Sequence, residues 1–371
     1  MHQQSQGTSV ISDTGSGNDG YSIEVDEITR EQWHWQLTRF DDASLYQTWD
    51  YGSKRWGEEN LSHLIVKKHG HIVCAAQSRI VKLPLLSAGM AYVRYGPMWK
   101  VRGSERNVMN LNRALYALIH EYAFRRGLFL RIRPWGFDEV DGVMRSAMNN
   151  AGFQLTKGLY RHKQQTVLLD LRPTEEELLQ KLRKKWRWCL RDAEGRNLHI
   201  IEGFDHRLFE LFRPVYAEML RAKRFRPGSQ LSDYERMQEV LPPDHRIRIT
   251  ICHNASIPVS GSVCSAIGET AIGLFAATGA EGRRCHAYYL LQWDEILWAK
   301  RLGCRFMDLG GINRLANPGV YHFKTGMGGS EETYLGVFDY CAAWFLRKLV
   351  LAIEGTLRGL ARVKAILYAH S

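Results

Sequence analysis

Two kinds of apolar spacing follow one another in the first half of the chain. Short apolar runs bounded by turn residues predict strands at 64–66, 72–76 and 92–95. The dipeptide His69-Gly70 lies between the first two runs and predicts the turn of a hairpin. From Asn107 to Arg126 apolar residues recur every three or four positions, which predicts a helix that Gly127 ends. A strand at 128–132 and a helix at 144–151 complete an α/β unit whose helices cover a mixed sheet.

The second half of the chain repeats this outline. A strand at 166–171 precedes a helix that opens at Thr174, because the Thr174 hydroxyl and the Glu177 carboxylate can cap it reciprocally. One apolar stripe predicts that this helix continues to Ala193. The remaining predicted elements are a helix at 208–221, strands at 246–252, 260–266 and 270–276, a helix at 288–301 and a strand at 306–309. The sequence therefore predicts two similar α/β (α+β) halves that meet near residues 161–165.

Both ends of the chain differ from these halves. Residues 1–20 are polar and lack the apolar core of a signal peptide, so we expect a disordered tail. Residues 342–369 form an amphipathic, mostly basic pattern, which predicts a helix docked on a domain or one that contacts a membrane surface or a partner. No apolar run is long enough to span a bilayer. We expect a cytoplasmic protein, and peripheral attachment to the inner face of the cell membrane stays open.

Charge and cysteine content narrow the class of partner. Among 371 residues, 50 Lys and Arg stand against 39 Asp and Glu, and the net charge of +11 favours an acidic partner such as nucleic acid, nucleotide phosphates or anionic lipid. The cysteines are scattered without a CxxC pair, so we expect reduced thiols and neither a disulfide framework nor a metal site. The sequence motifs of P-loop NTPases, Rossmann dehydrogenases, HExxH zinc proteases and GxSxG hydrolases are absent, which argues against those enzyme classes.

The most concentrated positive charge lies on the predicted helix at 181–196. Its basic residues include Arg183, Lys184, Lys185 and Arg187, and its acidic residues are few. Cations gathered on one helix match the phosphate backbone of a nucleic acid. A solvated face above an apolar stripe explains the same pattern, so both interpretations stay open.

Two further segments combine cations with aromatic or turn residues. Residues 47–56 place Tyr51 and Lys54 beside tryptophans, which suits a nucleotide-linked sugar and equally a buried aromatic core. Arg226 is followed by Pro227-Gly228, so we expect it on an ordered turn, where it could clamp a phosphate or simply be exposed.

The segment 286–336 combines a helix, a short strand, a Gly-Gly turn and a lysine bracketed by glycines. Asp308, directly before Leu309-Gly310-Gly311, is typical of a structural residue at a sharp turn. We predict a loop for Phe323 and Lys324. A cation held on such a loop suits a negatively charged substrate or a developing oxyanion. An ordinary lysine is the alternative from the residues alone.

Four blocks of the chain, in this order, resemble the FemABX family of aminoacyl-tRNA-dependent transferases that act on peptidoglycan precursors. The blocks are YVRYGPMW, DLRPTEEELLQKLRKKWRWCLRDA, QWDEILWAKRLGCRFMDLGG and GVYHFKTGMGG. The resemblance covers residues from about Ser44 to Asp339. It implies two tandem GNAT-like domains with the substrate in a cleft between them. The first domain would comprise residues 21–164 with 325–371, and the second residues 165–324.

The resemblance also implies roles for individual residues. Phe323 and Lys324 match a Phe-Lys pair near the tRNA end, where the lysine would stabilise the tetrahedral oxyanion. Arg226 and Lys54 match cations that contact the diphosphate of the acceptor, and Tyr234 falls near a tyrosine of the site. If the donor is a charged tRNA, the concentrated charge of the helix at 181–196 makes Arg183, Lys184, Lys185 and Arg187 the candidates for the tRNA-binding face.

The chain departs from the family pattern at two positions. Arg133 stands where the family has an aspartate that orients the acceptor, and Ala276 stands where it has a tyrosine. An extra cation in the cleft favours a more acidic acceptor. The expected partners are aminoacyl-tRNA as co-substrate and a UDP- or lipid-linked muropeptide or another envelope acceptor, without a metal or further cofactor. Two alternatives remain: an N-acyltransferase that uses an acyl thioester on an envelope glycan or sugar, and a non-catalytic basic protein that binds RNA or a membrane surface.

Overall fold

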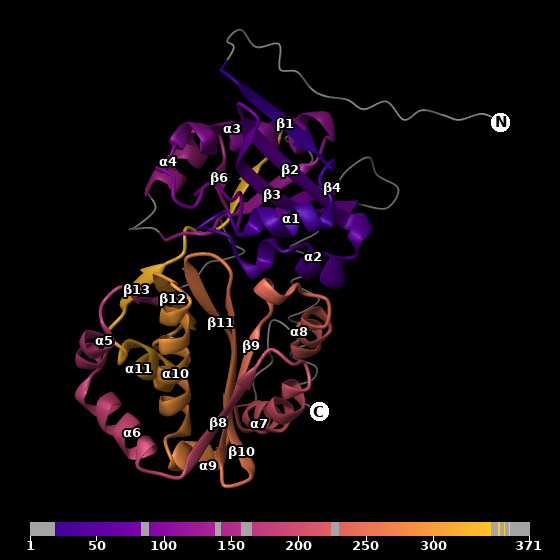
Figure 1. Ribbon diagram of the computed structural model, residues 1–371. Helices are drawn as coiled ribbons and strands as arrows, with labels where there is room; N and C mark the ends of the chain where they lie inside the picture. Colours follow the sequence, from indigo (N-terminus) through magenta and orange to yellow (C-terminus); the bar gives the residue numbers. More distant parts are fainter. Residues whose placement is uncertain are drawn as a thin grey trace, which may run out of the picture.

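The computed structural model describes residues 19–82, 89–137, 142–156, 165–223 and 230–342, together with 348, 352 and 356. It shows two α/β halves, stacked one above the other in Figure 1, each built on a seven-stranded mixed sheet. The predicted fold class, helix-covered mixed sheets in two similar halves, is confirmed. Most of the expected N-terminal tail, Arg226 and most of the expected C-terminal helix lie outside the described residues.

The first half contains six strands of the chain in sequence and the helices that connect them. Its elements are β1 (Tyr21–Val25), α1 (Arg30–Leu37), η1 (Leu45–Gln47), α2 (Trp49–Trp56), η2 (Glu58–Asn60), β2 (Leu61–Lys68), β3 (His71–Lys82), β4 (Gly89–Arg94), α3 (Val108–Leu118), the π-helical η3 (Ile119–Arg125), β5 (Phe129–Arg133), α4 (Gly142–Asn150) and β6 (Gln154–Leu155). The predicted hairpin turn is confirmed, since His69 and Gly70 both have positive φ, as a tight turn between right-twisted strands requires.

The second half follows directly. Its elements are β7 (Gln165–Asp170), α5 (Glu175–Lys181), α6 (Lys184–Glu194), β8 (Leu198–Gly203), α7 (Leu208–Lys223), α8 (Leu231–Gln238), η4 (Pro243–His245), β9 (Arg248–Asn254), β10 (Ile257–Ala266), β11 (Thr270–Thr278), α9 (Ala280–Arg284), α10 (Ala287–Arg301), β12 (Phe306–Ile312), α11 (Pro318–Thr325) and β13 (Ser330–Thr333). A last strand, β14 (Phe338–Tyr340), follows.

The prediction of one continuous helix in the first part of the second half was wrong. The helix expected from Thr174 to Ala193 is two helices, because Leu182 takes an extended conformation and ends α5. The capping box at Thr174 is present. Arg183, which follows Leu182, donates its backbone N–H to the Gly326 carbonyl at 2.8 Å, and the second helix, α6, begins after it. The apolar stripe thus continues across a break at Leu182, which a backbone contact with Gly326 causes.

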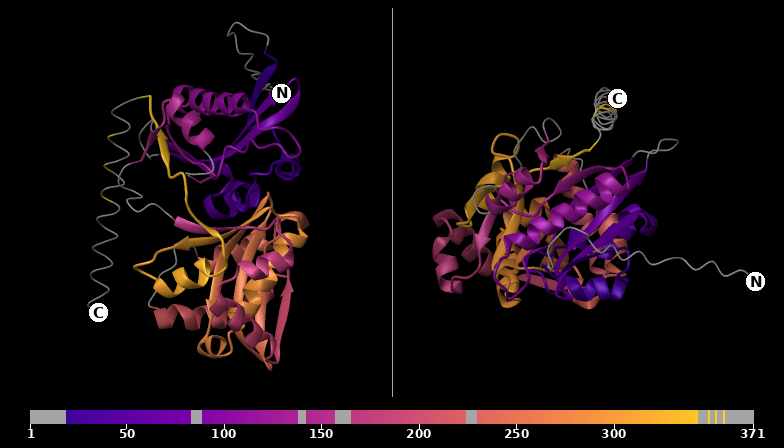
Figure 2. Two further views of the ribbon diagram at one scale, coloured as in Figure 1. Left: turned by 90° about the vertical axis from the view of Figure 1, so that its left-hand side faces the viewer. Right: turned by 90° about the horizontal axis from the view of Figure 1, so that it is seen from above.

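The two sheets are completed by strands that are exchanged between the halves. The first sheet has the order β1-β2-β3-β4-β5-β14-β6, and the second has the order β13-β7-β12-β11-β10-β9-β8. Strand β7 leaves the first half and inserts between β12 and β13, while β14 returns from the far end of the second half and inserts between β5 and β6. Figure 2 shows β14, in yellow, among the elements of the first half. The return to the first sheet follows Thr333, later than the boundary expected at residue 325.

Each sheet has one parallel pair, and the parallel pairs occupy equivalent places. In the first sheet β4 runs parallel to β5, and in the second β11 runs parallel to β12, while every other strand pair in both sheets is antiparallel. A helix connects the strands of each parallel pair, α3 in the first half and α10 in the second. The halves therefore share one topology, although no repeat is visible in their residues.

The contact between the halves resembles a protein core. One cluster of buried residues combines aromatic side chains from the first half with apolar residues of α7, α8 and β9–β11. Its first-half members include Tyr46, Tyr51, Tyr95, Trp135 and Phe137. An ion pair between Arg55 and Asp233 (2.9 Å) spans the contact at its edge. Because this interface is apolar and buried, we expect the halves to move little relative to one another.

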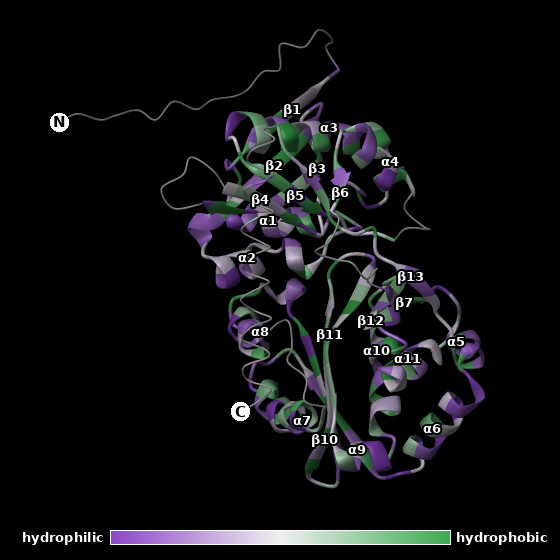
Figure 3. Ribbon diagram, turned by 180° about the vertical axis from the view of Figure 1, so that it is seen from behind, coloured by the Kyte–Doolittle hydropathy of each residue, from purple (hydrophilic) through white to green (hydrophobic). Residues whose placement is uncertain are grey.

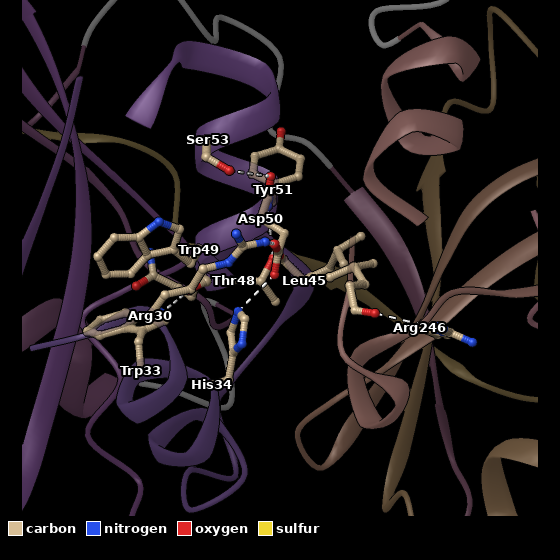
Figure 4. Close-up of polar contacts among 12 residues, drawn as sticks. Arg30, Trp33, His34, Leu45, Thr48, Trp49, Asp50, Tyr51, Ser53 and Arg246 are labelled. Carbon is tan, nitrogen blue, oxygen red and sulfur yellow. Dashed lines mark hydrogen bonds and ion pairs between the residues drawn. The ribbon is translucent and has the colours of Figure 1, made fainter. Parts of the chain in front are cut away.

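A histidine pair lies across the same contact. His245 of η4 faces His34 of α1 with ring centroids 5.6 Å apart, and neither ring nitrogen of His245 has a hydrogen-bond partner. On its other side His34 Nε2 lies 2.8 Å from Asp50 Oδ2, and Arg30 also binds this carboxylate (Figure 4). His245 is only 2 % exposed, and burial lowers its pKa to about 4. The native interface therefore holds this imidazole in its neutral form.

This burial predicts a loss of stability in mild acid. The unfolded chain takes up a proton on His245 below its ordinary pKa near 6.5, whereas the folded protein does not until about pH 4, so acid favours unfolding. Between these values the free energy of unfolding should fall by about 3 kcal/mol from this residue. Buried His63, whose pKa is also lowered to about 4 by burial, should add a similar loss. Urea titrations at several pH values measure this fall in the free energy of unfolding. The fall should be smaller in His245→Phe than in the wild-type protein, and it should equal the wild-type value in His71→Gln, a variant of an exposed histidine.

Among the described residues, no helix has both the length and the apolar character needed to cross a membrane. The cysteines, all of which lie in the described part of the chain, form no disulfide.

Candidate functional site

The candidate site is centred where the two parallel strands of the second sheet separate. Strand β11 pairs with β12 only from Thr270 to Ile272, and the strands diverge beyond that point. A cavity of about 190 Å³ opens there, with walls from β10, β11, α10 and β12. Lys324 of α11 completes the lining beside Gly310 and Gly311. The separation of the strands thus creates a small chamber with a cation in its wall.

Lys324 is fixed by backbone carbonyls. Its Nζ donates to Gly310 O and Gly311 O, at 3.0 Å each. The prediction of a loop for this residue was wrong, because Lys324 lies in the last turn of α11, a short helix that Asn317 caps and Pro318 begins. The helix gives the ammonium group a defined position, which electrostatic stabilisation of a developing charge requires.

Phe323 has a supporting position. Its ring packs against Trp186 of α6 (5.7 Å between centroids) and against Tyr288 and Tyr289 of α10 (5.2 and 5.0 Å). Tyr288 also lines the cavity. Phe323 therefore ties α11 to the two helices on either side and sets where the neighbouring Lys324 lies.

Asp308 organises the turn that Lys324 contacts. It is 1 % exposed, accepts from Gly310 N (2.8 Å) and from the Tyr334 hydroxyl (2.5 Å), and also contacts the Thr166 hydroxyl. Burial raises the pKa of Tyr334 far above its usual range, so its hydroxyl remains a donor. The expected structural role of Asp308 agrees with this network, which holds the Gly310–Gly311 backbone where the two strands part.

Tyr334 connects this network to the first half. Arg133, at the end of β5, lies over the Tyr334 ring (5.7 Å) and over the Tyr95 ring (5.2 Å). Tyr334 belongs to the linker between β13 and β14, and Phe137 pairs with it across the halves. The predicted site residue Arg133 is thus joined to Lys324 through Tyr334, Asp308 and the glycine turn.

A second arginine, Arg94, lies opposite Arg133 in the β4–β5 strand pair, and the sequence pattern did not single it out. Arg94, at the end of β4, places its guanidinium carbon 3.9 Å above the Tyr46 ring and donates to the Tyr51 hydroxyl. The Arg94 Nε is buried without a hydrogen-bond partner. Tyr51, predicted to bind substrate, is buried, and its ring packs against Tyr46 at 5.1 Å. Tyr51 therefore holds Arg94 through its hydroxyl group, and its ring is not exposed to solvent.

The other predicted substrate residues are dispersed. Lys54 is exposed on α2. Tyr234 of α8 is buried between Tyr51 (6.3 Å) and Phe275 (4.8 Å), so its ring forms part of the interface. Arg226 lies outside the described residues. The described residues contain no group of three or more His, Cys, Asp or Glu that could hold a metal ion.

The predicted tRNA-binding residues lie next to the chamber. Helices α5 and α6 form an outer edge of the second half, on the side of α10 and α11 (Figure 3). Arg183, Lys184 and Lys185 are exposed at the start of α6, which contacts the end of α11 through Arg183 N and Gly326 O. The guanidinium of Arg187 also donates to Gln180 O (2.7 Å) and Leu182 O (2.5 Å) and so caps α5. We call Arg183, Lys184 and Lys185 the basic ledge.

Comparison with known proteins agrees with this architecture. The sequence profile described as the FemAB family matches residues 244–353, which include β9–β14 and Lys324. This part of the chain is therefore similar to the FemAB family. Curated protein sequences gave no match. The crystal structure of FemX is similar to this chain, with a TM-score of 0.75 and 16 % identity, covering 88 % of this chain and 99 % of FemX.

Two further solved structures share the fold of this chain. One is a conserved protein of unknown function from Bacteroides thetaiotaomicron, with a TM-score of 0.53, 12 % identity and coverage of 86 % of this chain and 99 % of that one. The other is the C-terminal domain of a putative lysylphosphatidylglycerol synthetase from Agrobacterium fabrum, with a TM-score of 0.50, 10 % identity and coverage of 87 % and 96 %. The architecture of two similar α/β halves, each on a seven-stranded mixed sheet, is thus a fold that this chain shares with FemX.

Proposed function

We propose that this protein transfers an amino acid from aminoacyl-tRNA to an amine of a cell-wall precursor, either a UDP-linked or a lipid-linked muropeptide. The observation that carries the proposal is the position of Lys324, which is fixed by two carbonyls in the wall of the chamber between β11 and β12. The match of residues 244–353 to the FemAB family and the basic ledge beside the chamber favour a charged tRNA as the donor. Aminoacyl-tRNA would be the co-substrate, and the reaction needs no metal or further cofactor.

The reaction is an aminolysis of an ester. The acceptor amine attacks the ester carbonyl carbon, the C–N bond forms, and the C–O bond to the tRNA ribose breaks. The ribose hydroxyl leaves and takes the proton that the amine loses. Negative charge develops on the carbonyl oxygen, and Lys324 would stabilise it from its fixed position. Holding both substrates in place lowers the barrier further, because association converts a bimolecular step into one within a complex.

The acceptor would lie across the contact between the halves. Arg133 and Arg94 lie at adjacent strand ends facing this contact, and both are held by aromatic rings. Guanidinium groups in such positions bind diphosphates and carboxylates well, because their planar donors match these anions. The anionic part of a muropeptide precursor fits this pair, and a lipid-linked precursor would bring the protein to the membrane surface.

The direct test is a transfer assay with radiolabelled amino acids on a mixed pool of tRNAs. UDP-linked and lipid-linked muropeptides serve as acceptors, with and without RNase. We expect label in the acceptor that RNase abolishes, and separate charged tRNAs then identify the amino acid. RNase-resistant turnover with an acyl thioester would contradict the proposed donor and favour the N-acyltransferase alternative.

The basic ledge predicts a specific salt dependence. Reversing two charges, Lys184→Glu with Lys185→Glu, should weaken tRNA binding. It should also make the slope of log affinity against log salt shallower by about 1.5, because each phosphate contact contributes roughly 0.7–0.9. Filter binding between 50 and 200 mM salt, a range where phosphate contacts have large effects, measures both quantities. The matched control reverses Lys67 and Lys68, adjacent lysines of β2 in the first half. Equal effects of the two double variants would rule out the ledge as the RNA face.

A further inference from the structure

The size of the chamber restricts what can enter it. Pockets for drug-sized molecules have volumes of roughly 300–1,000 Å³. A volume of about 190 Å³ is enough for a group the size of one amino-acid side chain but too small for a nucleoside. If the ester carbonyl lies beside Lys324, the group that enters the chamber is therefore the side chain of the transferred amino acid.

The α10 wall of the chamber carries an acid. Glu295 is 2 % exposed and lines the cavity together with Gln292 and Tyr288. Its carboxyl group accepts from Gln292 Nε2 (3.1 Å) and from the Ser262 hydroxyl, and the Tyr288 hydroxyl donates to Gln292 Oε1 (3.2 Å). These neighbours are neutral, and they hold the carboxyl group in one orientation.

No cation forms an ion pair with Glu295 in the described part of the chain. Buried Arg248, whose positive charge partly offsets the rise in the pKa of Glu295, forms its ion pairs with other acids, since its guanidinium binds Asp294 (2.6 Å) and contacts Glu202. Burial raises the pKa of Glu295 to about 7. Burying a carboxylate without a neighbouring cation costs free energy, because the negative charge loses its hydration. A positively charged group of a ligand would offset that cost.

We propose that the chamber binds the side chain of the donor amino acid and that Glu295 selects a side chain ending in an amine. The inference rests on the proposed function for the identity of the donor. A short apolar side chain would leave Glu295 buried without a cation, whereas a basic side chain of four carbons would place its ammonium group against the carboxylate. A site with a buried polar group strongly rejects a ligand that cannot bind to that group. An apolar pocket, which discriminates only by the size and shape of the ligand, is less selective.

The selectivity can be measured without tRNA. Lysinamide and norleucinamide both carry an α-amine and a four-carbon side chain, but only lysinamide has the terminal amine. NMR titration of the full chain should show lysinamide binding at least tenfold more tightly. Glu295→Gln keeps the shape but removes the charge, so the preference should disappear in this variant. Glu210→Gln, a change of an exposed acid on α7, should retain it. Thermal unfolding of both variants checks that each is folded.

Equal binding of the two amides by the wild-type protein, binding of neither, or a preference that persists in folded Glu295→Gln would overturn the inference. Transfer assays with individually charged tRNAs separate it from the proposed function. A lysinamide preference that depends on Glu295, without transfer from any charged tRNA, would refute the tRNA donor and leave the amine site standing. Transfer from tRNAs with small apolar amino acids in preference to basic ones would refute the side-chain selectivity and leave the transferase standing.

Discussion

Lys324→Met is expected to lower the turnover number by about 10²–10³-fold while leaving the affinity for tRNA and acceptor nearly unchanged. The reason is that a fixed cation beside the ester carbonyl acts on charge that exists only in the transition state, so its loss reduces rate and not ground-state binding. Single-turnover kinetics with saturating charged tRNA measure the chemical step, and equilibrium binding of uncharged tRNA measures affinity.

The structure dictates the controls for this variant. Because Lys324 Nζ also holds the carbonyls of Gly310 and Gly311, its removal could loosen the turn. Thermal unfolding tests this, and Lys324→Arg should recover part of the rate if charge is what matters. Lys82→Met removes an exposed lysine of β3, far along the chain from the chamber, and should leave turnover unchanged. A loss of binding as large as the loss of rate would make Lys324 a binding residue.

The second large effect concerns stability at the exchanged strand. Arg131 of β5 donates to both carboxylate oxygens of Asp339 on β14, at 2.7 and 3.0 Å, and both side chains are 6–7 % exposed. Asp339→Asn removes the negative charge from a buried ion pair and is expected to lower the free energy of unfolding by about 3–5 kcal/mol. Urea denaturation measures this value.

A double-variant cycle separates the charge effect from packing. Replacing both partners with apolar residues of similar size, Arg131→Met with Asp339→Leu, should cost much less than Asp339→Asn alone, because neither charge is then buried. Asp205→Asn removes one partner of an exposed pair on the surface and should change the unfolding free energy very little. If the double variant is as unstable as Asp339→Asn, the strand is held by packing and not by this ion pair.

The general form of the fold could be predicted from sequence because it depends on local signals. Apolar periodicity, the Thr174 capping box and the His69-Gly70 turn are each decided within a few residues, and the structure has the elements they predict. The break at Leu182 could not be predicted in this way, because it depends on a backbone contact with Gly326, far along the chain. The same holds for Lys324, whose helical position follows from the packing of Phe323 on α6 and α10.

The candidate site was predictable only in part for the same reason. A cation at Lys324 and another at Arg133 stood out, but their connection runs through Tyr334 and Asp308, which meet only in the folded chain. Arg94 lies in a strand whose sequence contains no motif of a known binding site. Glu295 lies in a helix whose sequence is mostly apolar, so neither residue was predicted to belong to the site. Arg187 is a different case, since a residue that contributed to the basic pattern also caps a helix.

The exchange of strands has a consequence for biosynthesis. The ribosome makes β1 to β6 first, yet the strand that fills the gap between β5 and β6 is made only after the whole of the second half. Until then two strand edges of the nascent first sheet lack their partner and are open to wrong pairing. The second sheet has no such delay, because its inserted strand β7 precedes its other strands along the chain. Synthesis from the N-terminus normally lets the first-made unit fold first. Here the half that is made first is the half that is completed last.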